Sequence, residues 1–197
     1  MPTYWFQRKV CIAICGLKRS GKDTVADLIA SATGMAHVKV SAPLKRLVKD
    51  MFDLTPSQVE DDCKDDVDAR WGLSPREIMQ FVGTDMFQYK LQELMPSMGR
   101  RFWITKAIHD WGDQSVVVSD VRFNHELQEL RRHFDQVHVI RVQRRCVQQH
   151  TDTDSHVSEQ EYKTFLPCSV IDNNGSLYRL RCAVYDALNQ IEQTPPQ

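Results

Sequence analysis

Two glycines, Gly16 and Gly21, bracket a short basic loop and are followed directly by Lys22. In the spacing G-x-x-x-x-G-K, glycine lets backbone N–H groups fold around an anion, and the lysine ammonium reaches the outer phosphates. The positive N-terminal end of a following helix strengthens anion binding. The pattern therefore predicts a polyphosphate site. The residues expected to line it are Gly16, Lys18, Arg19, Ser20, Gly21, Lys22, Asp23 and Thr24.

One position departs from the motif. Asp23 stands where Ser or Thr would hold magnesium, and Thr24 follows one residue later. The alternative interpretation is a glycine-containing turn before an ordinary helix. The apolar run 9–15 before the loop and the helix-periodic apolar residues in 25–32 after it favour the phosphate loop.

A second oxygen ligand is expected at Asp120, which follows the apolar run 115–119. A carboxylate at the end of a buried strand, in a chain with a phosphate loop, is placed to organise Mg²⁺ or its waters. The alternative is a cap for the next helix. Thr24 and Asp120 are therefore the predicted magnesium ligands.

Basic side chains later in the chain could bind further phosphate. Arg76 follows Ser74-Pro75 at a strong helix start, and a planar guanidinium suits bidentate phosphate recognition. Arg144 follows the last residues of a strand and begins a polar stretch that resembles a short lid, whereas Arg141 alternates into the strand and could be a paired surface charge. Lys45 lies near a helix start but off its apolar stripe, and its position alone favours a solvated lysine.

Alternating strand and helix patterns position these residues. They predict a three-layer α/β fold with a parallel sheet of about five strands flanked by helices, and ligands beyond the carboxyl ends of the strands. A length of 197 residues suits one domain, 1–197. The expected strands are 9–15, 37–41, 115–119, 137–142 and 168–171. The expected further segments are an acceptor-binding helical segment 53–111, with Gly83-Thr84 interrupting or ending a helix, a lid-like segment 144–162 and a disordered tail 194–197.

Composition narrows the function classes. The net charge of −1 gives no reason to expect a nucleic-acid polymer or a membrane as partner, and no apolar run reaches the length of a membrane span. Six cysteines without C-x-x-C spacing are expected to be reduced thiols of a cytoplasmic-type compartment. His138, His150 and His156 lack the spacing of metal ligands, so no histidine metal site is expected.

Four blocks of the chain resemble a known family. GLKRSGKDTVADLI, from Gly16, looks like the phosphate loop of phage-type deoxynucleoside monophosphate kinases, in which Asp-Thr follows the lysine. SPREIMQFVGTDMF, from Ser74, is the most diagnostic block, and SDVRFNHELQEL, from Ser119, and the stretch 154–176 follow in the same order. A more distant likeness is to animal-type phosphomevalonate kinase, which also has Gly-Lys-Asp.

The resemblance implies an ATP-dependent kinase that converts a deoxynucleoside monophosphate to the diphosphate with Mg²⁺. By the family's pattern Arg76 clamps the substrate phosphate, and Trp103 packs on base or sugar, although core packing is an equal alternative for Trp103. The remaining substrate residues it implies are Lys45, Gly83, Thr84, Asp120, Arg122 and Glu126. The donor nucleotide would contact Arg141, Arg144, Asn174 and Gly175, and the catalytic set would be Lys22, Asp23, Arg76, Asp120 and Arg144.

Some alternatives stay open. His156 and Glu159 match a His-x-x-Glu of the family without an assigned role, and Asp23 could orient either the metal or the acceptor phosphate. The chain could instead phosphorylate another small phosphorylated acceptor, or bind nucleotide without turnover. The accepted bases and a homodimer are left undecided, and the expected location is the cytoplasm, of a host cell if the source is viral.

Overall fold

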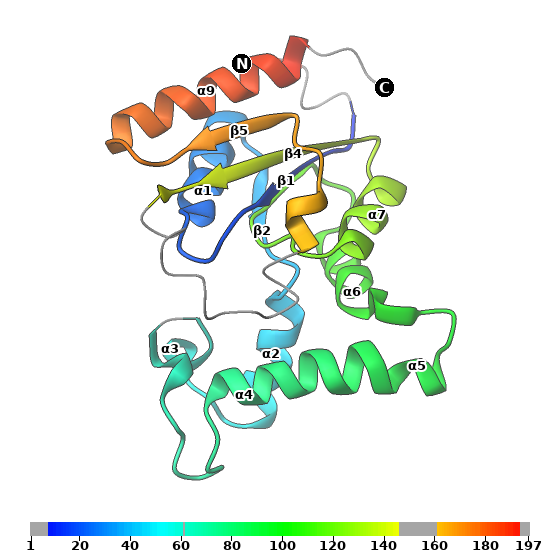
Figure 1. The fold of residues 1–197 in the computed structure, drawn as a ribbon. Coiled ribbons are helices and arrows are strands. Elements are labelled where there is room, and N and C mark those ends of the chain that lie inside the picture. The colour runs from blue at the N-terminus through cyan, green and yellow to red at the C-terminus, as the bar shows by residue number, and fades with distance from the viewer. Residues whose placement is uncertain (1–7, 61, 146–160, 194–197) are drawn as a thin grey trace. The chain divides into compact units, whose positions relative to one another are not determined.

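The computed structural model describes residues 8–60, 62–145 and 161–193 (Figure 1). The chain divides into two compact units. The sheet unit comprises Met1–Lys39 and Trp111–Gln197, and the helical unit comprises Val40–Asp110. The expected acceptor-binding segment 53–111 thus falls, except for its last residue, in the helical unit.

The sheet unit contains five parallel strands in the order β2-β3-β1-β4-β5. The central strand is β1 (Val10–Cys15), whose side chains are all buried because helices cover both faces of the sheet. This confirms the predicted α/β fold with a five-stranded parallel sheet. The other strands are β2 (Ala36–Val38), β3 (Val116–Val118), β4 (Gln136–Gln143) and β5 (Ser169–Asp172).

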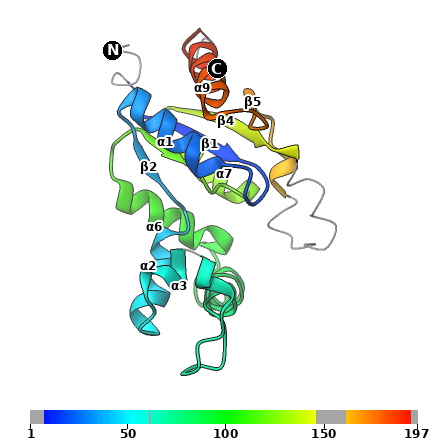
Figure 2. The ribbon, with the colours of Figure 1, turned by 90° about the vertical axis from the view of Figure 1, so that its left-hand side faces the viewer.

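Helices lie on both sides of this sheet (Figure 2). On one face, α1 (Lys22–Thr33) and α9 (Leu177–Gln193) bury apolar side chains against β1, β4 and β5. On the other face lies α7 (Asn124–His133), which buries Leu127 and Leu130, and the short helix η6 (Glu161–Thr164) follows the undescribed residues. Packing on both faces holds β1 in place and so sets the position from which the loop after its carboxyl end begins.

The helical unit is built around a long helix in several parts. Ser74 caps α4 (Pro75–Gln80): the Glu77 carboxylate accepts from the Ser74 N–H at 2.8 Å, and Ser74 Oγ accepts from the Glu77 N–H at 3.3 Å, which completes a capping box. The helix continues as the π-helical η3 (Phe81–Lys90) and α5 (Leu91–Leu94). The unit's other helices are α2 (Ala42–Met51), α3 (Pro56–Glu60), η2 (Asp62–Asp65), η4 (Gly99–Arg101) and α6 (Phe102–Trp111).

Two expectations for local structure were wrong. The second strand ends at Val38 rather than Ser41, because Lys39 leaves the sheet and its ammonium pairs with Asp23. Gly83-Thr84 does not interrupt the helix, which instead widens into π-helical turns there. The Gly83 carbonyl accepts a hydrogen bond from the Trp103 indole at 2.9 Å, which gives that carbonyl a partner within the widened segment.

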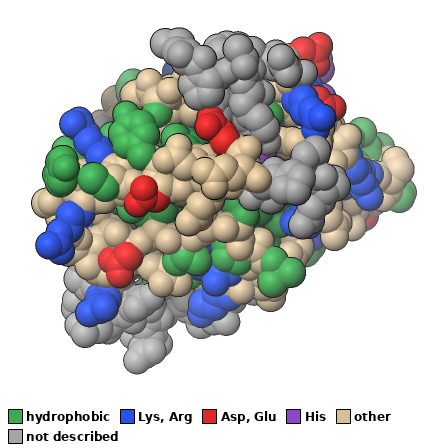
Figure 3. All heavy atoms as spheres, turned by 90° about the horizontal axis from the view of Figure 1, so that it is seen from above, with side chains coloured by type: hydrophobic (Ala, Val, Ile, Leu, Met, Phe, Trp, Pro, Cys, Tyr) green, Lys and Arg blue, Asp and Glu red, His purple; other side chains and the backbone are tan. Residues whose placement is uncertain are grey.

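Membrane spans, surface side chains and cysteines bear on the predicted partners and compartment. Within the described ranges, no helix is both long and apolar enough to span a bilayer. Figure 3, which looks down on the side carrying α9, shows hydrophobic, basic and acidic side chains interspersed among the described atoms. Cys11 and Cys15 are buried in β1, and the described cysteines are all free thiols.

Candidate active site

The loop after β1 has the backbone that its glycines predict. Gly21 adopts the left-handed conformation with φ of 94°, and Gly16 has φ of 146°. A Cβ on Gly16 would lie 2.3 Å from the carbonyl oxygen of Val142, and one on Gly21 would lie 2.2 Å from Nδ2 of Asn173. Both positions therefore exclude a side chain by space as well as by φ.

Lys22 lies across this loop. Its Nζ donates to the carbonyl of Gly16 at 3.0 Å and to that of Leu17 at 2.7 Å. The ammonium is thereby held over the backbone between the two glycines. A positive charge in that place, at the N-terminus of the twelve-residue α1, suits an anion.

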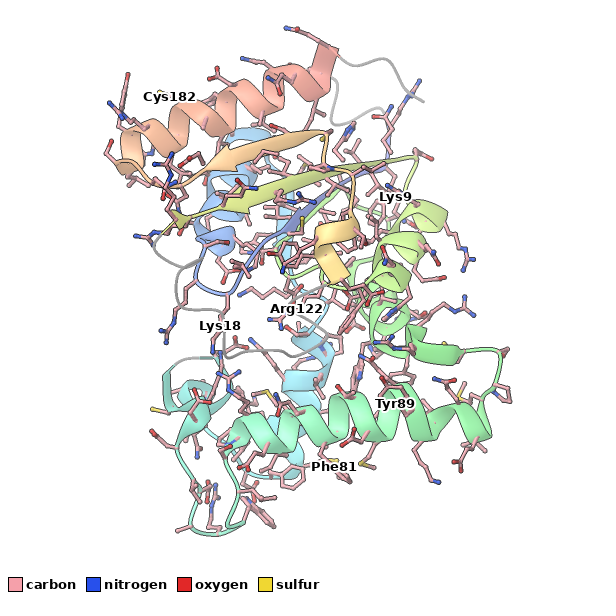
Figure 4. The ribbon with its side chains drawn as sticks, viewed as in Figure 1. Lys9, Lys18, Phe81, Tyr89, Arg122 and Cys182 are labelled. Atoms are coloured by element: carbon pink, nitrogen blue, oxygen red, sulfur yellow. The ribbon has the colours of Figure 1, made fainter. Side chains whose placement is uncertain are left out.

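The other loop residues divide into exposed and buried. Lys18 and Arg19 are exposed, and Arg19 has a positive φ of 63°, which is uncommon outside glycine. In Figure 4, Lys18 and Arg122 lie below the sheet, and Lys9 lies at the right of the sheet, just before β1. Ser20 is fully buried, and its Oγ has no hydrogen-bond partner among the described residues. A buried hydroxyl without a partner is costly, and Ser20 Oγ is such a group within this loop.

Asp23 sits in a chain of polar contacts. Its carboxylate accepts from Ser119 Oγ at 2.6 Å and from Lys39 Nζ at 3.1 Å. Ser119 Oγ also lies 2.8 Å from Nε2 of His37, whose Nδ1 lies 2.7 Å from Asp27. Partial burial opposes ionisation of Asp23, but the bonds from Ser119 and Lys39 outweigh it and lower its pKa. Asp23 therefore carries a negative charge at neutral pH.

The two predicted magnesium ligands both belong to the sheet unit. Thr24 is exposed in the first turn of α1, and Asp120 is half-buried two residues after β3. No group of three or more His, Cys, Asp or Glu side chains suited to a metal occurs in the described part of the chain. A hydroxyl and a carboxylate fit Mg²⁺, which is commonly held by one or two protein oxygens together with substrate phosphates.

Glu126, one of the substrate residues that the family resemblance implies, is buried at the start of α7. It is 7% exposed, and its Oε2 accepts from the backbone N–H groups of Arg122 at 2.8 Å and Phe123 at 3.0 Å. Burial raises the pKa of Glu126 to about 7, against the opposing effect of those two donors. Its observed role is to fix the loop that carries the exposed Arg122 and to satisfy the start of α7.

Arg141 and Arg144, the two arginines predicted to contact the donor nucleotide, differ in their contacts and exposure. Nη2 of Arg141 donates to the carbonyls of Phe165 at 2.7 Å and Lys163 at 3.2 Å, so Arg141 holds the segment at η6. Arg144 is exposed just after β4. Asn174 accepts from the backbone N–H of Arg145 at 2.7 Å and is exposed, as is Gly175. The contacts of Arg141 are with backbone carbonyls, and its buried Nε has no hydrogen-bond partner among the described residues.

In the helical unit, the two predicted phosphate-binding cations are both paired with carboxylates. Lys45, in α2, contacts Glu60, and Arg76, in the first turn of α4, makes a two-point contact with Asp65. The side chain of Arg76 remains 35% exposed. The guanidinium of Arg76 is thus already oriented toward an anionic group. A phosphate could take the place of the Asp65 carboxylate.

Trp103 is a core residue. It is 7% exposed, its ring centroid lies 4.7 Å from that of Phe87 and 5.1 Å from that of Phe102, and its indole N–H reaches Gly83. The structure thus favours core packing over base stacking for this residue. Gly83 is buried against Leu44, whose Cδ2 would lie 2.6 Å from an added Cβ, and Thr84 is half-buried.

Part of the predicted lid lies outside the described residues. His156 and Glu159, which match the family's His-x-x-Glu, fall in 146–160 together with His150, so all three lie outside the described residues. The sequence predictions also missed residues that shape the site, namely Asn173 beside Gly21 and the group Asp27, His37, Lys39 and Ser119 around Asp23. A signal was available for Ser119 and Asn173, which are polar residues at or near the carboxyl ends of the predicted strands 115–119 and 168–171, whereas His37 was expected at the start of the strand 37–41.

Comparison with known proteins adds to this geometry. The family model for deoxynucleotide monophosphate kinase matches residues 10–69 and 57–184. A provisionally named deoxynucleotide monophosphate kinase of Acanthamoeba polyphaga mimivirus is 28% identical over 172 residues, which is 82% of this chain and 86% of that protein.

Solved structures of other kinases are similar at lower identity. The shikimate kinase of Acinetobacter baumannii is 13% identical with a TM-score of 0.47, covering 97% of each chain. The gluconokinase of Sinorhizobium meliloti 1021 is 13% identical with a TM-score of 0.48, covering 94% of this chain and 93% of its own. Because the family model spans most of its length, the chain belongs to the deoxynucleotide monophosphate kinase family.

Proposed function

We propose that this protein transfers the γ-phosphoryl group of ATP to a deoxynucleoside monophosphate, giving the diphosphate and ADP. The observation that carries the proposal is the loop Gly16–Lys22, in which both glycines have positive φ and the Lys22 ammonium is bonded to the loop carbonyls of Gly16 and Leu17. Membership of the family supports the choice of acceptor.

The donor side of the proposal uses the sheet unit. Lys22 neutralises the outer phosphates, and Ser20 supplies a buried hydroxyl to the loop's ligand. Arg144 and the exposed Lys18 and Arg19 add positive charge for ATP. Catalysis of phosphoryl transfer is mainly positioning and charge neutralisation, so these roles need no covalent intermediate.

The acceptor side uses the helical unit. Arg76 binds the phosphate of the monophosphate by exchanging its carboxylate partner Asp65 for the ligand, and Lys45 similarly leaves Glu60. Arginine gives a planar two-point contact, whereas lysine contributes a single mobile charge. Gly83 and Thr84 are proposed to lie near the substrate, and Trp103 supports them from the core through its bond to the Gly83 carbonyl.

Mg²⁺ would be held by Thr24 and Asp120, directly or through water, with Asp23 nearby in the first turn of α1. When bound, the ion supplies positive charge to the phosphate oxygens of the donor. The protein's own residues keep that region ordered, because Asp23 is fixed by Ser119 and Lys39.

A coupled assay of ADP release tests the proposal. Purified protein is mixed with ATP, Mg²⁺ and, in separate reactions, each common deoxy and ribo monophosphate and phosphomevalonate. Turnover of at least one deoxynucleoside monophosphate, abolished by Lys22→Ala, is the expected result. Turnover of phosphomevalonate alone would replace the acceptor, and nucleotide binding without turnover of any acceptor would make the chain a non-catalytic nucleotide binder.

A further inference from the structure

The acidic residue in the phosphate-loop motif has dedicated partners. Asp23 follows Lys22 directly, so a bound polyphosphate would lie close to a carboxylate of the same sign. We propose that Ser119 and His37 are positioning residues that fix the Asp23 carboxylate, and that Lys39 neutralises it so that the loop still accepts phosphate. This inference rests on the proposed nucleotide site.

Hydrogen-bond donors along the chain can be assigned. An ionised carboxylate only accepts, so Ser119 donates its one proton to Asp23 at 2.6 Å. The Ser119 oxygen is then an acceptor, and Nε2–H of His37 donates to it at 2.8 Å. Nδ1 of His37 lies 2.7 Å from Asp27 Oδ1, and this contact orients the ring. The bonds that Asp23 accepts from Ser119 and Lys39 both favour a fixed, charged carboxylate.

Burial makes this arrangement more than a surface contact. Ser119 is 1% exposed at the end of β3, and the side chain of His37 is 18% exposed beside it on β2. Both come from strands of the sheet, while Asp23 and Asp27 are four residues apart on one face of α1. The network therefore ties the first turn of α1 to the carboxyl ends of two neighbouring strands.

Charge compensation falls to Lys39. Its Nζ lies 3.1 Å from Asp23 Oδ2, the oxygen that Ser119 does not use. An exposed ion pair of this kind contributes little to stability. Its effect on a neighbouring trianion or tetraanion is larger, because removing Lys39 exposes the ligand to an uncompensated negative charge.

A binding experiment separates this role from direct contact of Lys39 with phosphate. ADP affinity is measured by calorimetry in EDTA, so that no metal contributes, for the unaltered protein and for Lys39→Met, Asp23→Asn and the double variant. We expect Lys39→Met to weaken ADP about tenfold, and we expect the double variant to bind within about threefold of Asp23→Asn alone. Lys9→Met is the control, since it removes a positive charge at the opposite end of β1.

A double-mutant cycle of Ser119 and Asp23 tests the positioning role. Ser119→Ala should lower kcat for the deoxynucleotide acceptor about tenfold when Asp23 is present and have no effect in the Asp23→Asn background, and Ser119→Thr should restore most of the rate. A loss from Ser119→Ala that persists in that background overturns the positioning role. Weakening by Lys39→Met that persists in the double variant overturns the compensation role.

These outcomes are distinct from failure of the proposed function. ADP binding with the expected coupling but no turnover of any deoxynucleotide would reject the acceptor and retain the compensation by Lys39. Failure of the unaltered protein to bind ADP would overturn both.

Discussion

Asn173 donates a hydrogen bond from Nδ2 to the carbonyl of Ser20 at 2.9 Å, and the same amide fills the space beside the α-carbon of Gly21. The loop after β5 thereby braces the loop Gly16–Lys22 after β1. Backbone N–H of Asn173 also bonds to the Gln143 carbonyl at 2.8 Å, which ties that brace to the end of β4.

Gly21→Ala should lose both stability and nucleotide binding. A methyl group there meets Asn173 at 2.2 Å and must also adopt a φ of 94°. Gly34→Ala is the matched control, because Gly34 has φ of 77° but no heavy atom within 4 Å of an added Cβ. The control should cost about 1 kcal/mol in the free energy of unfolding from φ alone. Equal losses in the two variants, by denaturant unfolding, would show that the brace is unimportant.

Lys22→Ala should lower kcat by about 100-fold or more while the protein stays folded. Its ammonium contacts the carbonyls of Gly16 and Leu17 and is thereby held over the loop backbone. Steady-state kinetics and thermal unfolding measure the two effects. Lys49→Ala, in the last turn of α2, is the control and should leave kcat unchanged.

Arg76→Ala should raise KM for the monophosphate about tenfold or more, with a much smaller change in KM for ATP, because a charged hydrogen bond to phosphate is lost. Arg70→Ala is the control, since Arg70 is likewise paired with an aspartate, Asp68, in the helical unit but lies outside the family's diagnostic block. Equal increases in both KM values would mean that Arg76 is not an acceptor ligand.

The buried Glu126 predicts a pH dependence of stability. Its pKa rises from 4.5 to about 7 on folding, so between these values the folded state binds more protons than the unfolded state. The contribution of Glu126 to the free energy of unfolding is therefore greatest below pH 4.5. It falls by about 3 kcal/mol in total as the pH rises to 7. Glu126→Gln keeps an acceptor for the Arg122 and Phe123 N–H groups and should flatten that slope in urea unfolding. An unchanged slope would contradict the buried, proton-binding carboxyl.

The regular fold follows from local sequence patterns. The nearly continuous apolar runs of β1 and β3 and the Ser74-Pro75 helix start are short-range signals, and all three elements form where they were predicted, to within one or two residues. The π-helical turns through Gly83 were not predictable in this way, because they accompany a long-range bond from Trp103.

The candidate site likewise has features that the sequence reveals and features that depend on the fold. The loop Gly16–Lys22 has a fixed spacing that sequence alone reveals. The partners of Asp23 and the brace from Asn173 are separated from the loop by up to 153 positions, and only the order of strands in the sheet brings them together. Glu126 was assigned by its motif, whereas its burial and its two backbone donors depend on the fold.

The measurement that tests the central claim most directly is initial-rate ADP release by the unaltered protein with ATP, Mg²⁺ and each monophosphate in turn. The account predicts turnover that depends on a deoxynucleoside monophosphate and disappears in Lys22→Ala. ADP release that is the same with and without any deoxynucleoside monophosphate would contradict it.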